Sequence, residues 1–137
     1  MTTSAPGLGR RREAREEALA VLYESAMTSV DVSAGLDGRR IKPDAYAVEM
    51  ATGVDDSKDE IESLISANLK GWVISRMAPV DRIIASMATW ELLNSDDVPT
   101  GVILSEAVEL ATQYSGEESP RFLNGVLRAV ANEVREG

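Results

Sequence analysis

Apolar residues recur three and four positions apart along most of this 137-residue chain. That spacing lines them up on one face of an α-helix, whereas a half-buried β-strand needs strict alternation of apolar and polar residues. No segment of the sequence combines sustained alternation with an enrichment in β-branched residues, the usual signature of a strand. The sequence therefore predicts an all-α fold of roughly six or seven helices, in one domain long enough to bury a single core.

Capping residues and prolines set the expected boundaries. Residues 1–9 are small and include Gly and Pro, so we expect a flexible N-terminal arm there, followed by a helical domain over residues 10–137. Residues 28–42 show no period and are predicted to form a long loop. Gly71 is the expected end of one helix, because glycine is common just past a helix C-terminus. Helices are expected to begin at Arg10, Pro43, Ser57, Pro79, about Thr100, and Ser119.

The last expected helix contains an unusual glycine. Asn124-Gly125 usually signals a hairpin turn, yet apolar residues continue through it at helical spacing. A glycine inside a helix costs about 1 kcal/mol relative to alanine. Either another helix packs closely against Gly125, or a ligand approaches its exposed backbone. Phe122, the only phenylalanine, lies near this position with Asn124 and Arg128, and a simple core role for Phe122 stays open.

Charge is distributed unevenly along the chain. The net charge of −9 argues against a broad nucleic-acid surface, because phosphate binding normally needs basic side chains. However, four arginines stand within six positions at the start of the first expected helix: Arg10, Arg11, Arg12 and Arg15. Positive charge is unfavourable at a helix N-terminus, which favours a functional role over a merely solvated turn. We expect local nucleic-acid binding by this segment and attraction of the acidic remainder to a basic protein.

Most enzyme chemistries lack their usual residues in this sequence. Without His or Cys there is no imidazole acid–base group, thiol nucleophile or typical zinc site, and no P-loop motif occurs. The acids from Asp55 to Glu62 do not fit an EF-hand, which would need Gly at 60 and Glu at 66. We therefore expect no enzyme activity, no catalytic residue, no cofactor and no metal site. No apolar run approaches the roughly 18 residues of a membrane span, so no membrane partner and a cytoplasmic location are expected.

Ordered motifs across the chain resemble one protein family. They are Arg11-Arg12-x-x-Arg15 followed by Tyr23, Trp72-x-x-x-Arg76-Met77-x-x-Val80-Asp81-Arg82 leading to Trp90-Glu91-Leu92, Asp97-Val-Pro99 with Ser105-Glu-Ala-Val-Glu-Leu110, and Arg121-Phe-Leu-Asn-Gly-Val-Leu127. Together they resemble the transcription antitermination factor NusB family. The resemblance covers roughly Arg10 to Val134 and is weakest from Thr28 to Pro43. It implies two packed three-helix subdomains in one all-helical body.

The resemblance also implies a function and partners. Members of the family bind boxA, a short single-stranded RNA in ribosomal-RNA leader transcripts, together with the basic ribosomal protein NusE. They act with other Nus factors on elongating RNA polymerase. An arginine cluster would hold phosphates, an aromatic ring would stack on an unpaired base, and an amide would bond a base edge. The expected RNA-binding residues are Arg10, Arg11, Arg12, Arg15, Arg121, Phe122, Asn124 and Arg128. The expected partner-binding residues are Tyr23, Asp81 and Glu91.

Two positions depart from the family pattern, and three other interpretations remain. Ser86 and Ser105 stand where many members carry Arg and Asn, and Arg128, often an acid in the family, is a candidate to compensate for the cation missing at Ser86.

The chain could instead resemble only the accessory RNA-binding domain of ribosomal-RNA methyltransferases. It could also be a helical protein-interaction scaffold or a small DNA-binding regulator. Finally, a homodimer could hide the RNA surface.

Overall fold

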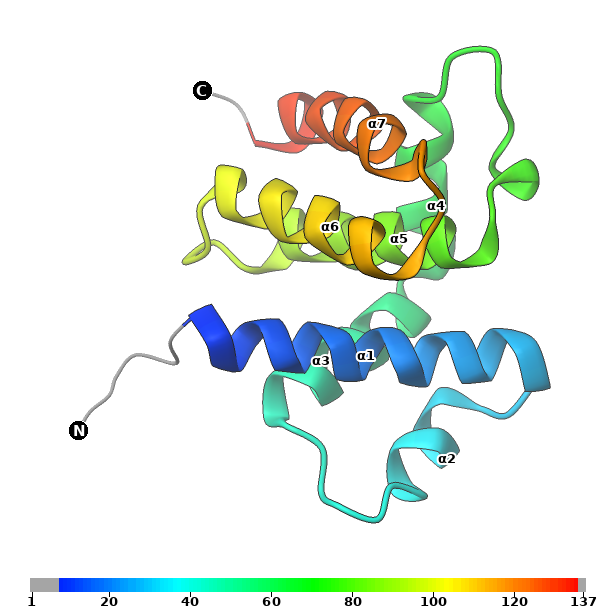
Figure 1. Ribbon diagram of the computed structural model, residues 1–137, viewed down its shortest axis with the longest axis vertical. Coiled ribbons are helices and arrows are strands. Elements are labelled where there is room, and N and C mark those ends of the chain that lie inside the picture. The colour runs from blue at the N-terminus through cyan, green and yellow to red at the C-terminus, as the bar shows by residue number, and fades with distance from the viewer. Residues whose placement is uncertain (1–7, 136–137) are drawn as a thin grey trace.

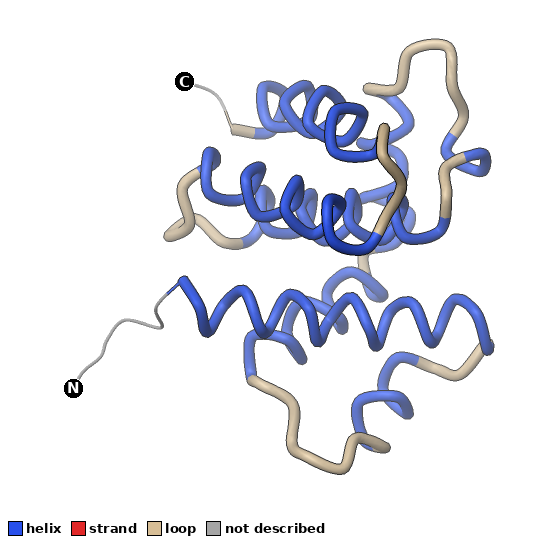
Figure 2. Tube along the Cα trace, viewed as in Figure 1, coloured by secondary structure: helices blue, strands red, loops and turns tan. Residues whose placement is uncertain are grey.

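The computed structural model describes residues 8–135, and every regular element in that range is helical. The prediction of an all-α fold is therefore confirmed (Figures 1 and 2). In chain order the elements are α1 (Leu8–Thr28), α2 (Val32–Asp37), α3 (Ala45–Asp56), α4 (Lys58–Ala67), the 3₁₀ turn η1 (Ile74–Arg76), α5 (Pro79–Asn94), α6 (Thr100–Tyr114) and α7 (Ser119–Val134). Helix α1 begins at Leu8, within the stretch 1–9 that was expected to be a flexible arm, and residues 1–7 lie outside the described range.

The helices form two groups, one on each side of a shared central helix. Helices α1, α2 and α3 pack together in the lower part of Figure 1, and α4, α6 and α7 surround α5 in the upper part. Helix α5 contacts α1 and α3 as well as α4, α6 and α7. Accordingly, every residue of α5 from Ile84 to Leu92 is buried. A helix enclosed on all sides is mostly apolar around its whole circumference, as this segment is, and its one charged residue, Glu91, is paired with Arg15.

A glycine of α3 lies against a large side chain of α5. A Cβ atom added to Gly53 would overlap the indole ring of Trp90, at 2.7 Å from Cε2. The indole is itself buried and packs edge-on against the ring of Tyr46, with the centroids 6.1 Å apart. Gly53 is therefore the position that lets the bulky Trp90 lie between the two helix groups.

Three local predictions differ from the structure. The expected loop over residues 28–42 contains α2, whose Val32 and Leu36 are buried. One apolar pair is too short a pattern to reveal a period. Helix α4 ends at Ala67, and Gly71 lies beyond it at a φ of +67°, in the connection to η1. Ser57 precedes α4 but makes no side-chain capping bond, because α3 and α4 follow each other almost without a break.

Within the described range, no helix combines the length and apolar character needed to span a bilayer.

Candidate nucleic-acid interface

Three arginines of α1 reach across to acids of the other helix group. Arg11 Nη2 lies 3.1 Å from Asp97 Oδ2, in the connection between α5 and α6. Arg12 donates from Nε and Nη2 to the two carboxylate oxygens of Glu106 on α6, at 3.0 and 2.7 Å. Arg15 makes the same two-point contact with Glu91 on α5, at 2.8 and 2.7 Å. The arginine motif therefore joins the two halves of the molecule.

Arg15 and Glu91 form an internal pair. Each residue is only 2% exposed. Burial lowers the pKa of Arg15, but the hydrogen bonds and charge of Glu91 outweigh it, so the pKa lies above its ordinary value. Neither residue presents charged atoms at the surface. We therefore revise two expectations: in this structure Arg15 does not face RNA phosphates, and Glu91 does not face a protein partner.

Glu91 also anchors α3. The hydroxyl of Tyr46 donates to Glu91 Oε2 at 2.7 Å and lies 2.8 Å from Ser95 Oγ. Burial and the negative charge of Glu91 raise the pKa of Tyr46. The guanidinium of Arg11 stacks over the Tyr46 ring, 4.4 Å from its centroid, which is within the range of a cation–π contact. One buried carboxylate thus holds side chains from α1 and α3 against α5.

Arg12 differs from Arg15 in that its side chain is 48% exposed. Its partner Glu106 is buried, and the hydrogen bond from Arg12 lowers the pKa of Glu106 while raising that of Arg12. The side chain of Arg11 is 22% exposed. The side chain of Arg10 lies outside the described residues. Of the arginines in this motif that the structure describes, Arg12 is therefore the best placed to meet a ligand.

A second set of expected RNA-binding residues lies on α7. Arg121 and Arg128 are exposed, and Asn124 is half-buried. Phe122 is half-buried: its side chain packs against the hydrophobic core and is still partly exposed to solvent. Gly125 is exposed, and a Cβ atom added there would meet nothing within 4 Å. Close packing of another helix is thereby excluded as the reason for Gly125.

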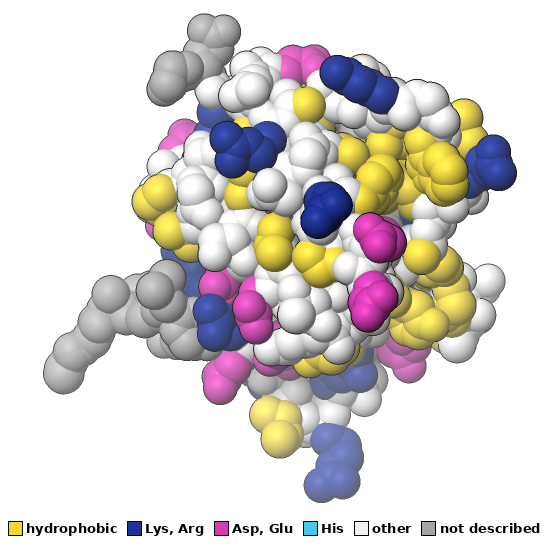
Figure 3. Space-filling view, turned by 45° about the horizontal axis from the view of Figure 1, so that its top comes forward, with side chains coloured by type: hydrophobic (Ala, Val, Ile, Leu, Met, Phe, Trp, Pro, Cys, Tyr) yellow, Lys and Arg dark blue, Asp and Glu magenta, His cyan; other side chains and the backbone are white. Residues whose placement is uncertain are grey.

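The two sets are separated by α6. In Figure 1, α6 lies between α1 and α7, and the first turns of α1 and α7 point toward opposite ends of the bundle. Figure 3 shows the Lys and Arg side chains of one face as single, scattered groups rather than as a continuous basic patch. A ligand that contacts both sets must therefore extend across α6.

The expected partner-binding residues are placed differently from one another. Tyr23 is 40% exposed on α1. Asp81, in the first turn of α5, is buried and accepts hydrogen bonds from the hydroxyls of Ser115 and Ser119, the latter at 2.8 Å. Its carboxylate thus links α5 to the segment that enters α7. We revise the expectation that Asp81 binds a partner, because its buried carboxylate already accepts hydrogen bonds inside the protein.

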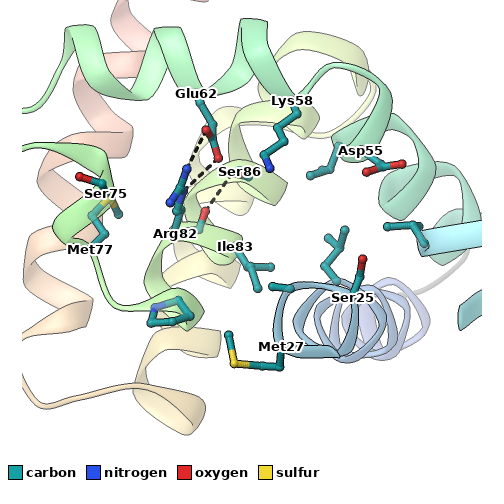
Figure 4. Close-up of a pocket in the computed structure, with 15 residues that line it drawn as sticks. Ser25, Met27, Asp55, Lys58, Glu62, Ser75, Met77, Arg82, Ile83 and Ser86 are labelled. Atoms are coloured by element: carbon teal, nitrogen blue, oxygen red, sulfur yellow. Dashed lines mark hydrogen bonds and ion pairs between the residues drawn. The ribbon is translucent and has the colours of Figure 1, made fainter. Parts of the chain in front are cut away.

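A cavity of about 410 Å³ opens beside the end of α1 (Figure 4). Its walls come from α1, α2, the junction of α3 and α4, the segment around η1, and α5; they include Leu22, Met27, Val54, Met77, Pro79 and Ile83. On one side Arg82 makes a two-point ion pair with Glu62, at 2.9 and 2.8 Å. Ser86 is buried and donates to the carbonyl oxygen of Arg82 at 2.9 Å, within its own helix. The position where many family members carry Arg therefore contributes only a short hydroxyl to this wall.

Sequence reasoning missed the acids that hold the arginines. Asp97 and Glu106 were noted only as parts of motifs, and nothing in a single sequence connects Arg12 to a residue 94 positions later. A pattern of correlated substitution among relatives is the signal that could have joined them. Among residues 8–135, no group of three or more acids gathers in a way that could hold a metal ion.

The chain matches known proteins over most of its length. A model of the NusB family matches residues 12–132. A transcription antitermination protein NusB from Paenarthrobacter aurescens (strain TC1) is 42% identical over 124 residues, which cover 88% of this chain and 91% of the relative. The transcription antitermination protein NusB of Salinispora tropica is 44% identical over 128 residues, covering 88% of this chain and 94% of the relative.

Solved structures show the same fold. The chain is similar to the structure of T. maritima NusB, with a TM-score of 0.84 and 30% identity over 97% of this chain and 94% of that one. It is also similar to a chain in the crystal structure of the antitermination factors NusB and NusE in complex with dsRNA. The TM-score there is 0.79, with 25% identity over 92% of this chain and 98% of that one.

Proposed function

This chain belongs to the NusB family, and from that membership we propose that it is a transcription antitermination factor that binds RNA together with NusE. The RNA is single-stranded boxA of ribosomal-RNA leader transcripts, and the complex acts with other Nus factors on elongating RNA polymerase. The protein contributes binding surfaces and no catalytic step. A solved complex of related antitermination factors, NusB and NusE with dsRNA, supports the RNA and the NusE parts of this proposal.

The exposed backbone at Gly125 carries the RNA part of the proposal. A helix-interior glycine is unfavourable, and no neighbouring helix requires this one. Arg121 and Arg128 are exposed seven positions apart, two helical turns, so they lie on one face of α7. A strand lying along that side of α7 would meet two cations, the partly exposed Phe122 ring and the Asn124 amide. These are the groups that hold phosphates, stack bases and bond base edges.

Charge complementarity supports the NusE part. Lys and Arg number 14 against 23 Asp and Glu, so the protein carries a net charge of −9, which attracts a basic partner. Tyr23 offers an exposed aromatic side chain on α1, and aromatic residues are enriched at the centres of protein interfaces. With Asp81 and Glu91 occupied internally, attraction of NusE would come from the acidic surface as a whole rather than from these two carboxylates.

A gel-shift titration tests the proposal directly. Labelled single-stranded boxA RNA is titrated with the protein alone and with added NusE, at fixed salt, against unlabelled duplex DNA of equal length. We expect single-stranded boxA to bind, NusE to tighten that binding, and the duplex DNA to compete poorly. Equal and weak binding of every nucleic acid, unaffected by NusE, would instead indicate an interaction scaffold. Sedimentation of the same samples would reveal a homodimer that hides the RNA surface.

One substitution locates the RNA on α7. Arg128→Glu is expected to weaken boxA binding. The plot of log K against log salt concentration should also become less steep by about 1, the change expected when one phosphate contact is lost. Lys42→Glu is the matched control, because it makes the same charge change at an exposed residue before α3. If both variants weaken binding equally, the effect is one of net charge, and α7 is not the contact surface.

A further inference from the structure

Glu106 holds the guanidinium of Arg12 in one orientation. The pair uses Nε and Nη2 of Arg12, at 3.0 and 2.7 Å from the two carboxylate oxygens, so the third nitrogen, Nη1, takes no part in it. An arginine has five N–H donors in a rigid plane, and a two-point contact along one edge of that plane fixes the direction of the others. The remaining donors of Arg12 therefore have a defined direction before any ligand arrives.

The two partners differ sharply in exposure. The side chain of Glu106 is 8% exposed, whereas that of Arg12 is 48% exposed. Glu106 is itself held from behind, because Arg15 Nη1 lies 3.6 Å from its Oε1 and Arg15 is fixed by Glu91. The carboxylate thus connects a buried cation to an exposed one. It lies on α6, the helix that a strand reaching from α1 to α7 has to cross.

We propose that Glu106 is a positioning residue for RNA: it fixes Arg12 so that the free edge of the guanidinium meets a phosphate. This inference rests on the proposed RNA-binding function. It assigns a role in RNA binding to a negatively charged residue, which would not itself contact the RNA phosphates. Ordering a long, flexible side chain in advance removes an entropy cost that binding otherwise bears. Glu106 would therefore strengthen RNA binding even though its charge repels phosphate.

Positioning and simple electrostatics predict opposite results. If Glu106 acts only through its charge, neutralising it should tighten RNA binding, because one negative charge near the phosphates is removed. If it positions Arg12, neutralising it should weaken binding. Glutamine keeps the size of the side chain but places an amide donor opposite an arginine donor, so one of the two bonds is lost. The sign of the change in affinity decides between the two roles.

Helix α6 supplies a matched control. Glu109 is exposed, lies three residues after Glu106, and adds negative charge near Arg12. Its carboxylate accepts a hydrogen bond from the Gln113 amide at 3.3 Å and makes no two-point contact with the Arg12 guanidinium. Glu109→Gln therefore removes the same charge, with the same change of shape, from the same helix. It reports the purely electrostatic effect.

The experiment measures the dissociation constant of labelled single-stranded boxA RNA for the full chain with NusE present. Glu106→Gln is expected to bind about 2- to 10-fold more weakly than the parent, whereas Glu109→Gln binds equally or slightly more tightly. Arg12→Ala should also weaken binding. The double variant Arg12→Ala/Glu106→Gln should bind no more weakly than Arg12→Ala, because Glu106 acts through Arg12. Thermal unfolding of every variant shows whether it is folded at the assay temperature.

Arg12→Lys keeps the charge and leaves the buried carboxylate in place, so it tests positioning even if Glu106→Gln proves too unstable. It should bind RNA more weakly than the parent, because a lysine cannot make the two-point contact. Tighter binding by Glu106→Gln, additive losses in the double variant, or full affinity in Arg12→Lys would each overturn the proposal. If the parent protein itself fails to bind RNA, the proposed function is at fault and not the role of Glu106.

Discussion

Two glycines inside helices have opposite surroundings. Gly53 faces the indole of Trp90, with no space for even one more carbon atom, while Gly125 faces open space. The first is required by packing and the second is not. A residue that lowers helix stability without a packing reason points to a role outside the folded core, since most positions of this kind improve when glycine is replaced.

Replacing Gly125 by Ala separates stability from binding. The variant should be more stable by about 0.5–1 kcal/mol, because alanine favours the helix and its Cβ meets no atom. At the same time it should bind boxA RNA more weakly, because the methyl group occupies the space beside the exposed backbone. Denaturant unfolding and the gel-shift titration measure the two effects on the same sample.

The control for this variant is Gly101→Ala in the first turn of α6, where a Cβ also meets nothing. It should leave RNA affinity unchanged. If Gly125→Ala gains stability and keeps its full affinity, no ligand approaches the backbone there.

At the scale of elements, α5 is held at both ends by side chains from elsewhere in the chain. Asp81 in its first turn accepts the hydroxyls of Ser115 and Ser119. At the other end Arg135 donates to the carbonyl oxygens of Glu91, Leu92 and Ser95 at 2.8–3.2 Å. An acid at the start and a cation at the end both match the helix dipole. The central helix is thus fixed at one end by Ser115 and by Ser119, the first residue of α7, and at the other end by Arg135, just after α7.

The contact between α3 and α5 should tolerate no added volume. Gly53→Ala places a methyl group within the Trp90 indole, so either the ring or α3 must shift. Forcing extra volume into a packed core typically costs about 1–3 kcal/mol, which outweighs the helix preference of alanine. A thermal melt should show a midpoint lower by several degrees. An unchanged or raised midpoint would mean that the two helices separate easily.

At the scale of the whole molecule, charged pairs span the boundary between the helix groups. Arg11–Asp97, Arg12–Glu106 and Arg15–Glu91 each join α1 to the other group, and the Tyr114 hydroxyl donates to Glu16 at 3.2 Å. The Arg15 and Glu91 charges are buried, so removing one partner would leave the other uncompensated. The segment that the sequence marks as a nucleic-acid contact is therefore also the connection between the two halves.

Acid should weaken this connection. The hydrogen bond from Arg12, followed by the charges of Arg12 and Arg15, lowers the pKa of Glu106 against the opposing effect of burial. A carboxyl group whose pKa is lower in the folded state than in the unfolded state stabilises the fold at pH values above its ordinary pKa of 4.5. That stabilisation is lost as the pH falls through the pKa of the group in the folded protein. The stability difference between the parent and Glu106→Gln should therefore shrink below pH 4.5. Denaturant titrations at a series of pH values measure it, and a difference that does not change with pH would contradict this account.

The helical fold class, most helix positions and the family can be predicted from the sequence alone. Helix formation depends on contacts between residues three and four positions apart, so the spacing of apolar residues is enough to predict a helix. Proline positions then indicate where helices begin. The same reasoning missed α2, whose single buried pair is too short to show a period. It also left two explanations for Gly125, because the distance to another helix is not a local property.

The exposure of each charged residue depends on how the helices pack, which a single sequence does not show. Arg12 and Arg15 look alike in the sequence, yet one is half exposed and the other is enclosed with Glu91. Their partners lie 94 and 76 residues away. An ion pair forms where two helices meet, and the meeting of α1 with α5 and α6 results from burying their apolar faces. Local sequence therefore places an arginine on a helix, whereas the packing of the helices decides whether it meets an acid, water or a ligand.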